Sequence, residues 1–150
     1  MRSARVLAMV LGVLMWVGCQ STKTEGEPDT VRNGVGMSGW RPEAIRASLI
    51  AFLTERNYEL VDSDRLNLDF DRPASQWLAM RHGSFVNPET FIRMRVFVVG
   101  VGSGDYWVGF EPLVVTERGS SFETAKPIKG AVRKEMQSLL EEWKAVELAP

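Results

Sequence analysis

Two stretches of alternating side chains, joined by a glycine-rich turn, constrain the fold of this chain most strongly. In residues 89–100 the apolar side chains take every second position: Ile92, Met94, Val96 and Val98. The positions between them carry Arg93, Arg95, Phe97 and Val99. Successive side chains of a strand point to opposite faces, so this spacing predicts a strand with one buried face. Residues 106–115 predict a second strand, and the turn at 102–105 makes the pair an antiparallel hairpin.

Two longer stretches show the spacing of amphipathic helices. In residues 41–57 the apolar side chains recur on one face: Ile45, Leu49, Phe52 and Leu53. In residues 131–148 a longer apolar stripe is formed by Val132, Met136, Leu139, Leu140, Trp143 and Val146. Residues three and four positions apart lie on the same side of a helix, so both stretches are expected to pack that side against the sheet.

The remaining segments complete an α+β fold. Residues 58–61 and 65–70 predict a second hairpin, and residues 117–129 a long polar connection. Residues 75–82 are either a short helix capped by Ser75 or an extended connection, and we favour the helix. The expected element order is α-β-β-(α)-β-β-α. We therefore predict a four-stranded antiparallel sheet with the two long helices packed on one face, all within a single domain of residues 40–150.

The N-terminus has the features of an export signal. Arg2 and Arg5 precede an apolar run at residues 6–17, which Gly18 and Cys19 close. A short basic segment followed by about 7–15 apolar residues is typical of a secretory signal peptide. A membrane-spanning helix needs roughly 20 apolar residues, so this run is too short for a permanent span.

The junction Val17-Gly18-Cys19 resembles the lipobox of bacterial lipoproteins. The resemblance implies that residues 1–18 are removed and that the Cys19 thiol receives a diacylglycerol, with fatty acyl chains such as palmitate. Residues 19–39 would then be the lipidated cysteine and a flexible tether. Two or more acyl chains give stable membrane anchoring without a spanning helix. Because Gln20 follows the cysteine, the resemblance implies the periplasmic side of the outer membrane in a host with two membranes.

Charge and cysteine content exclude several classes of function. The chain has 18 basic and 19 acidic residues, and loss of Arg2 and Arg5 leaves 16 basic residues and a side-chain charge of −3. This balance argues against nucleic-acid binding and against an electrostatic attraction to anionic lipid. Cys19 is the only cysteine, so an intramolecular disulfide is excluded.

Two motifs resemble metal or cofactor sites but fail in their spacing. Asp62 and Asp64 begin like an EF-hand loop, but Leu66 and Asn67 stand where an oxygen ligand and a glycine are required. The glycine-rich run at 100–105 ends in Asp105 and precedes a strand, whereas a phosphate-binding loop needs a third glycine and a helix. We interpret both as hairpin turns, and we expect no metal and no cofactor.

Catalytic chemistry has weak support in the sequence. His82 is the only histidine, and no serine lies in a nucleophile-elbow motif. Asp69, Asp71 and Glu111 lie near strand ends, and paired carboxylates are the groups that hydrolyse glycosides. A carboxylate-dependent hydrolase of the cell envelope therefore remains an alternative, but we expect no catalytic residues.

The sheet face opposite the helices is the best candidate for function. It is expected to carry Arg93, Arg95, Phe97, Val99 and Trp107. A solvated sheet face normally shows polar residues, whereas aromatic residues and arginine are enriched at protein interfaces. We therefore expect a non-enzymatic envelope lipoprotein that binds a protein partner through this face, unless a loop or the short middle helix covers it. A carrier of a small apolar ligand is a further alternative.

Overall fold

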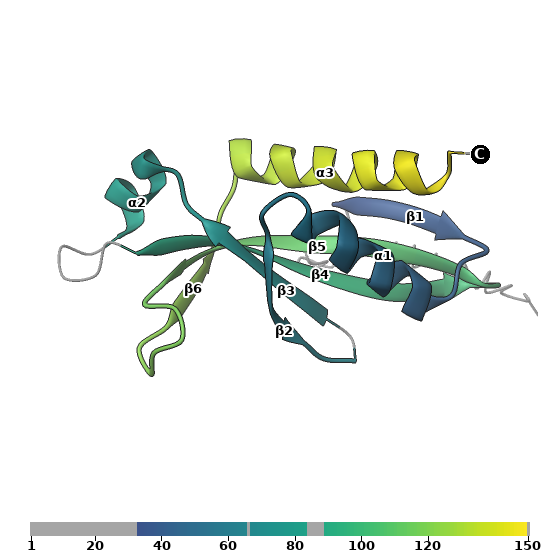
Figure 1. Cartoon of the computed structure of the whole chain (residues 1–150), viewed down its shortest axis with the longest axis horizontal. Coiled ribbons are helices and arrows are strands. Elements are labelled where there is room, and N and C mark those ends of the chain that lie inside the picture. Colours follow the sequence, from purple (N-terminus) through teal and green to yellow (C-terminus); the bar gives the residue numbers. More distant parts are fainter. Residues whose placement is uncertain (1–32, 66, 84–88, 150) are drawn as a thin grey trace, which may run out of the picture.

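An antiparallel sheet forms the centre of the computed structural model, which describes residues 33–65, 67–83 and 89–149 (Figure 1). In this part of the chain the sheet has six strands, and three helices accompany it. In chain order the elements are β1 (Gly34–Ser38), α1 (Pro42–Thr54), β2 (Glu59–Ser63), β3 (Asn67–Pro73), α2 (Gln76–His82), β4 (Thr90–Gly102), β5 (Asp105–Thr116), β6 (Thr124–Pro127) and α3 (Ala131–Glu147). The proposed signal peptide and Cys19 lie outside the described residues.

The predicted four-stranded sheet is wrong, because β1 and β6 add two strands. β1 lies within residues 19–39, which the sequence led us to expect as tether, and β6 lies within the expected polar connection. In neither strand do apolar and polar residues alternate along the whole length. β1 has only two buried apolar side chains, Val35 and Met37, and every residue of β6 is exposed. The α+β class and the antiparallel pairing agree with the prediction.

The strand order is β2-β3-β4-β5-β1, with β6 also paired to β5. β1 pairs with residues 105–109 of β5, whereas β6 pairs with residues 113–116. Pro112 lies between these two stretches, and its carbonyl accepts a hydrogen bond from the Ile128 N–H at 2.9 Å. Proline has no N–H to donate to a neighbouring strand. The outer edge of β5 is therefore shared by two short strands that meet at the proline.

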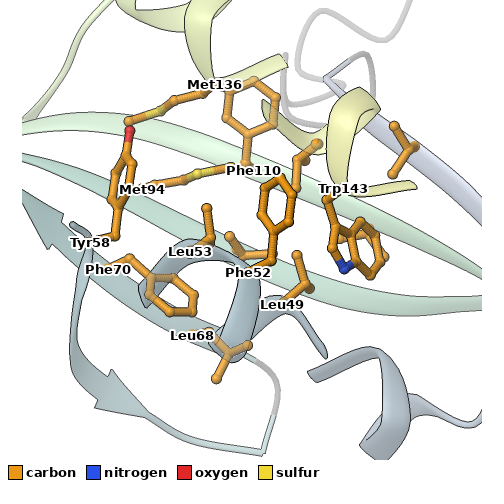
Figure 2. Packing of buried hydrophobic residues seen from close by; sticks show 14 of the residues in the cluster. Leu49, Phe52, Leu53, Tyr58, Leu68, Phe70, Met94, Phe110, Met136 and Trp143 are labelled. Atoms are coloured by element: carbon orange, nitrogen blue, oxygen red, sulfur yellow. The ribbon is translucent and has the colours of Figure 1, made fainter. Parts of the chain in front are cut away.

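Both long helices cover the same face of the sheet. The register places Leu68, Val96 and Phe110 side by side on that face, and Phe70 beside Met94. The helices meet them with buried side chains from α1 (Ile45, Leu49, Phe52 and Leu53) and from α3 (Val132, Met136, Leu140 and Trp143) (Figure 2). These are the apolar faces that the sequence predicted, except that Leu139 is only partly buried and Val146 is exposed, and they form one continuous core.

Polar contacts also help to fix the helices. The Trp143 indole N–H, within the core, donates to the Ser48 hydroxyl of α1 at 2.8 Å. The Gln137 side chain of α3 accepts a hydrogen bond from the Gly34 N–H at 2.9 Å and donates to the Gly34 carbonyl at 3.2 Å. The amide of Gln137 thus replaces a neighbouring strand for the first residue of β1, which lies at the sheet edge.

The helix at 75–82 forms, but its expected cap does not. α2 begins at Gln76, and the Ser75 side chain makes no capping hydrogen bond.

Asn57, which follows α1, has a φ of 62°, the left-handed conformation in which helices often end. None of the described helices is long and apolar enough to cross a membrane.

Candidate functional site

The face of the sheet that α1 and α3 leave uncovered, here called the open face, carries rows of opposite charges. Asp69 of β3 lies directly opposite Arg95 of β4, and Glu111 of β5 lies on the other side of Arg95. In the next row Asp71 lies opposite Arg93. Directly opposed side chains in an antiparallel pair are close enough for opposite charges to interact.

Arg93 is buried, with 8 % of its surface exposed. Its Nε and Nη2 atoms donate to the two carboxylate oxygens of Asp71 at 2.7 and 2.9 Å. Its Nη1 donates to Glu123 at 2.8 Å. The hydrogen bonds to Asp71, above all, hold the pKa of Arg93 well above its usual value. The structure therefore places Arg93, a predicted partner-binding residue, inside the ion-pair network, where it supports the surface and does not form it.

Arg95 makes a similar but more exposed pair. Its Nε and Nη2 atoms donate to Asp69 at 2.9 and 2.8 Å, while 39 % of the side chain stays exposed. The hydrogen bonds to Asp69 raise the pKa of Arg95, and the charge of Glu111 adds to the effect. Arg95 is thus reachable from solvent, but its charge is already matched.

The loop between β5 and β6, residues 117–123, rests on the same end of the open face. Arg118 of this loop bonds Glu59 at 2.8 Å and approaches Asp71 to 3.2 Å. Glu123 bonds Arg93 and also accepts a hydrogen bond from the Gly119 N–H at 2.8 Å. That backbone hydrogen bond, followed by the effect of Arg93, lowers the pKa of Glu123. The loop covers the Arg93 end of the face, as one of the sequence-based alternatives proposed.

The other end of the open face is apolar and more accessible. Phe97 lies over Gly109 of the neighbouring strand, since a Cβ atom there would come within 2.2 Å of the ring. A Cβ atom on Gly34 of β1 would come within 3.0 Å of Trp107 Nε1 and still closer to the backbone of β5. Val99 lies opposite Trp107 and is 50 % exposed. We call Phe97, Val99 and Trp107 the hairpin patch.

Glycines opposite the aromatic residues shape the hairpin patch. The absence of a side chain on Gly109 leaves room for the Phe97 ring, and both aromatic side chains are half-buried. The Trp107 indole N–H is buried and finds no acceptor within the described part of the chain. Val101, further along β4, is 63 % exposed. The hairpin therefore presents apolar surface at the end of the sheet away from α2 (Figure 1).

The carboxylates of the hydrolase alternative are only partly brought together. Asp69 and Asp71 share one face of β3, and Glu111 lies two strands away. A polar hollow of about 530 Å³ is lined in part by Asp69, Arg93 and Arg118, but Asp71 and Glu111 are not among its lining residues. Both Asp69 and Asp71 accept two hydrogen bonds from an arginine. The arrangement is that of a charge-matched network and gives little support to a catalytic carboxyl pair.

The turn motifs have structural roles. The Asp64 carboxylate accepts hydrogen bonds from the Asn67 N–H at 2.7 Å and from Asn67 Nδ2 at 3.0 Å, which closes the β2–β3 turn. His82 is exposed as the last residue of α2. Among the described residues, no group of three or more histidine, cysteine or acidic side chains is placed to hold a metal ion.

Sequence reasoning missed Arg118 and Glu123, which come from the segment expected to be a plain connection. A signal was present in the strands themselves, where Asp69 and Asp71 alternate in step with Arg93 and Arg95. Their pairing required the neighbouring placement of β3 and β4, which α2 and its flanking residues separate in the sequence.

Comparisons with known proteins add little to this picture. No protein-family model matches the chain. No curated protein matches it either. Among solved structures, the chain is similar to the adenylate sensor from AMP-activated protein kinase in complex with 5-aminoimidazole-4-carboxamide 1-β-D-ribofuranotide. The likeness has a TM-score of 0.47 at 12% identity and covers 74% of this chain and 94% of that chain. A score at this level does not establish a shared fold.

Proposed function

We propose that this protein is a bacterial envelope lipoprotein, anchored through Cys19, whose domain binds a protein partner through the hairpin patch. One observation carries the proposal: Val99 is half exposed beside Phe97 and Trp107, two half-buried aromatic side chains that lie close to glycines of the neighbouring strands. Anchoring rests on the lipobox-like Val17-Gly18-Cys19 and is independent of the domain. The proposed role is non-enzymatic, with the patch as the contact surface.

Supported aromatic side chains suit this role for an energetic reason. Side chains that are already ordered lose little conformational freedom on binding, so the burial of their exposed edges contributes directly to affinity. Aromatic residues at the centre of an interface often carry most of its binding energy. The ion pairs of Arg93 and Arg95 join β3 to β4 on the same face, next to the patch.

The hydrolase alternative has less support from the same face. A glycosidase uses one carboxyl group as an acid and a second as a base or nucleophile. Here the two carboxylates that share a strand face are each engaged by a guanidinium group through both oxygens. Freeing Asp71 would break the network that joins the loop to the sheet, and freeing Asp69 would break its pair with Arg95.

Photo-cross-linking in the native membrane tests the proposed contact. A photoreactive phenylalanine analogue replaces Val99 in the full chain, and a matched variant carries it at Val146, which is 57 % exposed on α3. Irradiation should give a discrete protein adduct from position 99 and none from position 146. Adding Val99→Glu to an affinity-capture experiment should abolish recovery of the same partner, because a charge is placed in the centre of an apolar contact.

Two results would contradict the proposed contact through the hairpin patch. Equal cross-linking from both positions, or capture that survives Val99→Glu, would remove the hairpin patch from consideration. Val99→Glu is a cleaner probe than a change at Arg95, because a glutamate at position 95 would lie between Asp69 and Glu111 and disturb the sheet itself. Thermal unfolding of the variant checks that the domain stays intact.

A further inference from the structure

A groove of about 930 Å³ lies at the end of the sheet opposite the hairpin patch. Residues of α2, the end of β3 and the start of α3 line it. These elements lie in the left half of Figure 1. Its apolar walls include Trp77, Leu78, Ile92, Ile128 and Val132. This volume is in the range of pockets that bind small organic molecules, roughly 300–1,000 Å³.

The rim of the groove is positively charged. Arg81 of α2 stacks on Trp77, with its guanidinium carbon 5.3 Å from the ring centre, and Lys129 precedes α3. Neither cation has an ion-pair partner among the described residues, whereas Arg72 is paired with Glu135 at 2.6 Å. Arg72 also lines the groove, and its Nε is buried without an acceptor in the described part of the chain. The groove therefore combines an apolar floor with two unmatched positive charges.

The start of α3 adds to the positive electrostatic potential of the groove. Gly130, the N-cap residue, provides no side-chain hydrogen bond, and the first turn contains no acidic residue. The positive end of the helix dipole thus lies at the groove, where Glu135, which is paired with Arg72, is the acidic residue of α3 in the lining. Trp77, 58 % exposed, extends the apolar surface from the floor to the mouth.

We infer that this groove binds a small amphipathic carboxylate, with its chain on the apolar walls and its headgroup between Arg81 and Lys129. A single negative charge next to an apolar body matches the two halves of the groove. A carboxylate also fits the planar donors of a guanidinium group, with which it can form two parallel hydrogen bonds. The groove is far from the hairpin patch, so this inference stands apart from the proposed partner contact.

Ligand titration monitored at the tryptophan side chains tests the inference. The full chain, labelled with ¹⁵N at tryptophan, is held in nanodiscs of an uncharged lipid and titrated with decanoate, decanol and decyl phosphate. Empty nanodiscs give the free concentration of each compound. The Trp77 indole signal should move saturably with decanoate, whereas that of Trp143, which is buried in the core, should stay in place. Decanoate should bind at least about tenfold more tightly than decanol, since hydrogen bonds to charged groups contribute that much or more.

Two double variants separate the charges of the groove from general charge effects. Arg81→Gln with Lys129→Gln should weaken decanoate binding by about tenfold or more and leave decanol binding unchanged. Arg65→Gln with Lys144→Gln makes the same change in charge at residues that do not line the groove, and it should leave both affinities unchanged. Unshifted Trp40 and Trp143 signals in the free variants show that the fold is retained.

Several results would overturn the inference. These are an immobile Trp77 signal, equal affinities for decanol and decanoate, or equal effects of the two double variants. Tighter binding of decyl phosphate than of decanoate would also contradict the inference, because it would indicate that the groove prefers a phosphate headgroup to a carboxylate.

Discussion

Two arginines in the same strand face show how burial changes the role of a side chain. Arg93 and Arg95 are two positions apart, and each forms a two-point pair with an aspartate of β3. The Asp71 side chain is fully buried, while the Arg95 side chain is 39 % exposed. A buried pair tolerates the loss of one partner poorly, because the remaining charge is left without water or a counter-charge.

We therefore predict unequal costs for the two arginines. Arg93→Ala should lower the free energy of unfolding by about 3 kcal/mol, because it leaves Asp71 with only the more distant Arg118. Arg95→Ala should cost less, because the side chain it removes is 39 % exposed and the buried Asp69 keeps Arg93 at 4.0 Å. Urea unfolding of the two variants measures both values.

A second substitution separates charge from packing in that comparison. Adding Asp71→Asn to Arg93→Ala should recover part of the lost stability, since the amide carries no charge that needs a partner. Equal losses for Arg93→Ala and Arg95→Ala would show that burial does not govern these pairs.

At the scale of elements, the loop at 117–123 is held to the sheet mainly by charge. Arg118 and Glu123 reach across to Glu59, Asp71 and Arg93, whereas Phe122 at the loop tip is 74 % exposed. A loop that rests on ion pairs and buries little apolar surface opens more readily than the elements it joins. Its attachment should therefore respond to pH.

The direction of that response follows from Glu123. Its pKa is below the ordinary value of 4.5 in the folded protein, so its ionised form stabilises the fold. This contribution is complete above about pH 4.5 and is lost as the pH falls through the lowered pKa. The stability difference between wild type and Glu123→Gln should be constant near neutral pH and shrink in acid. Urea midpoints measured across this range test it, and a difference independent of pH would contradict it.

The elements that the sequence predicted are those whose own residues show their environment. Phe70 and Met94 alternate with charged residues, because one face of each strand packs against the helices and the other carries the ion pairs. β1 escaped prediction because Gly34 and Gly36 leave it little pattern of its own, and its place depends on β5 and Gln137. The groove could not be predicted, because it joins α2 to the start of α3, distant segments whose contact no local spacing records.

At the scale of the whole molecule, anchoring and recognition are proposed to reside in different parts of the chain. The described domain offers a partner surface at one end of the sheet and a groove at the other. The proposed lipid site, Cys19, precedes β1 by fifteen residues. This separation allows anchoring to be tested without disturbing the domain.

We expect the mature protein to begin at Cys19 and to carry acyl chains there. Mass spectrometry of the membrane-extracted protein should show the loss of residues 1–18 and an added diacylglycerol on the cysteine. The wild type should partition with detergent, because several acyl chains give stable anchoring, and Cys19→Ala should lack the added mass. An unmodified Cys19 in the wild type would contradict lipid anchoring and would indicate a secreted protein instead.

The double hydrogen bond between Gln137 and Gly34 has a mechanical consequence. Any tension transmitted through the residues that precede Asn33 reaches the domain at the first residue of β1. There the backbone is bound on one side to β5, where Phe110 donates to the Asn33 carbonyl, and on the other side to α3. A pulling force is therefore divided between the sheet and the C-terminal helix at its point of entry, so β1 is not peeled away alone.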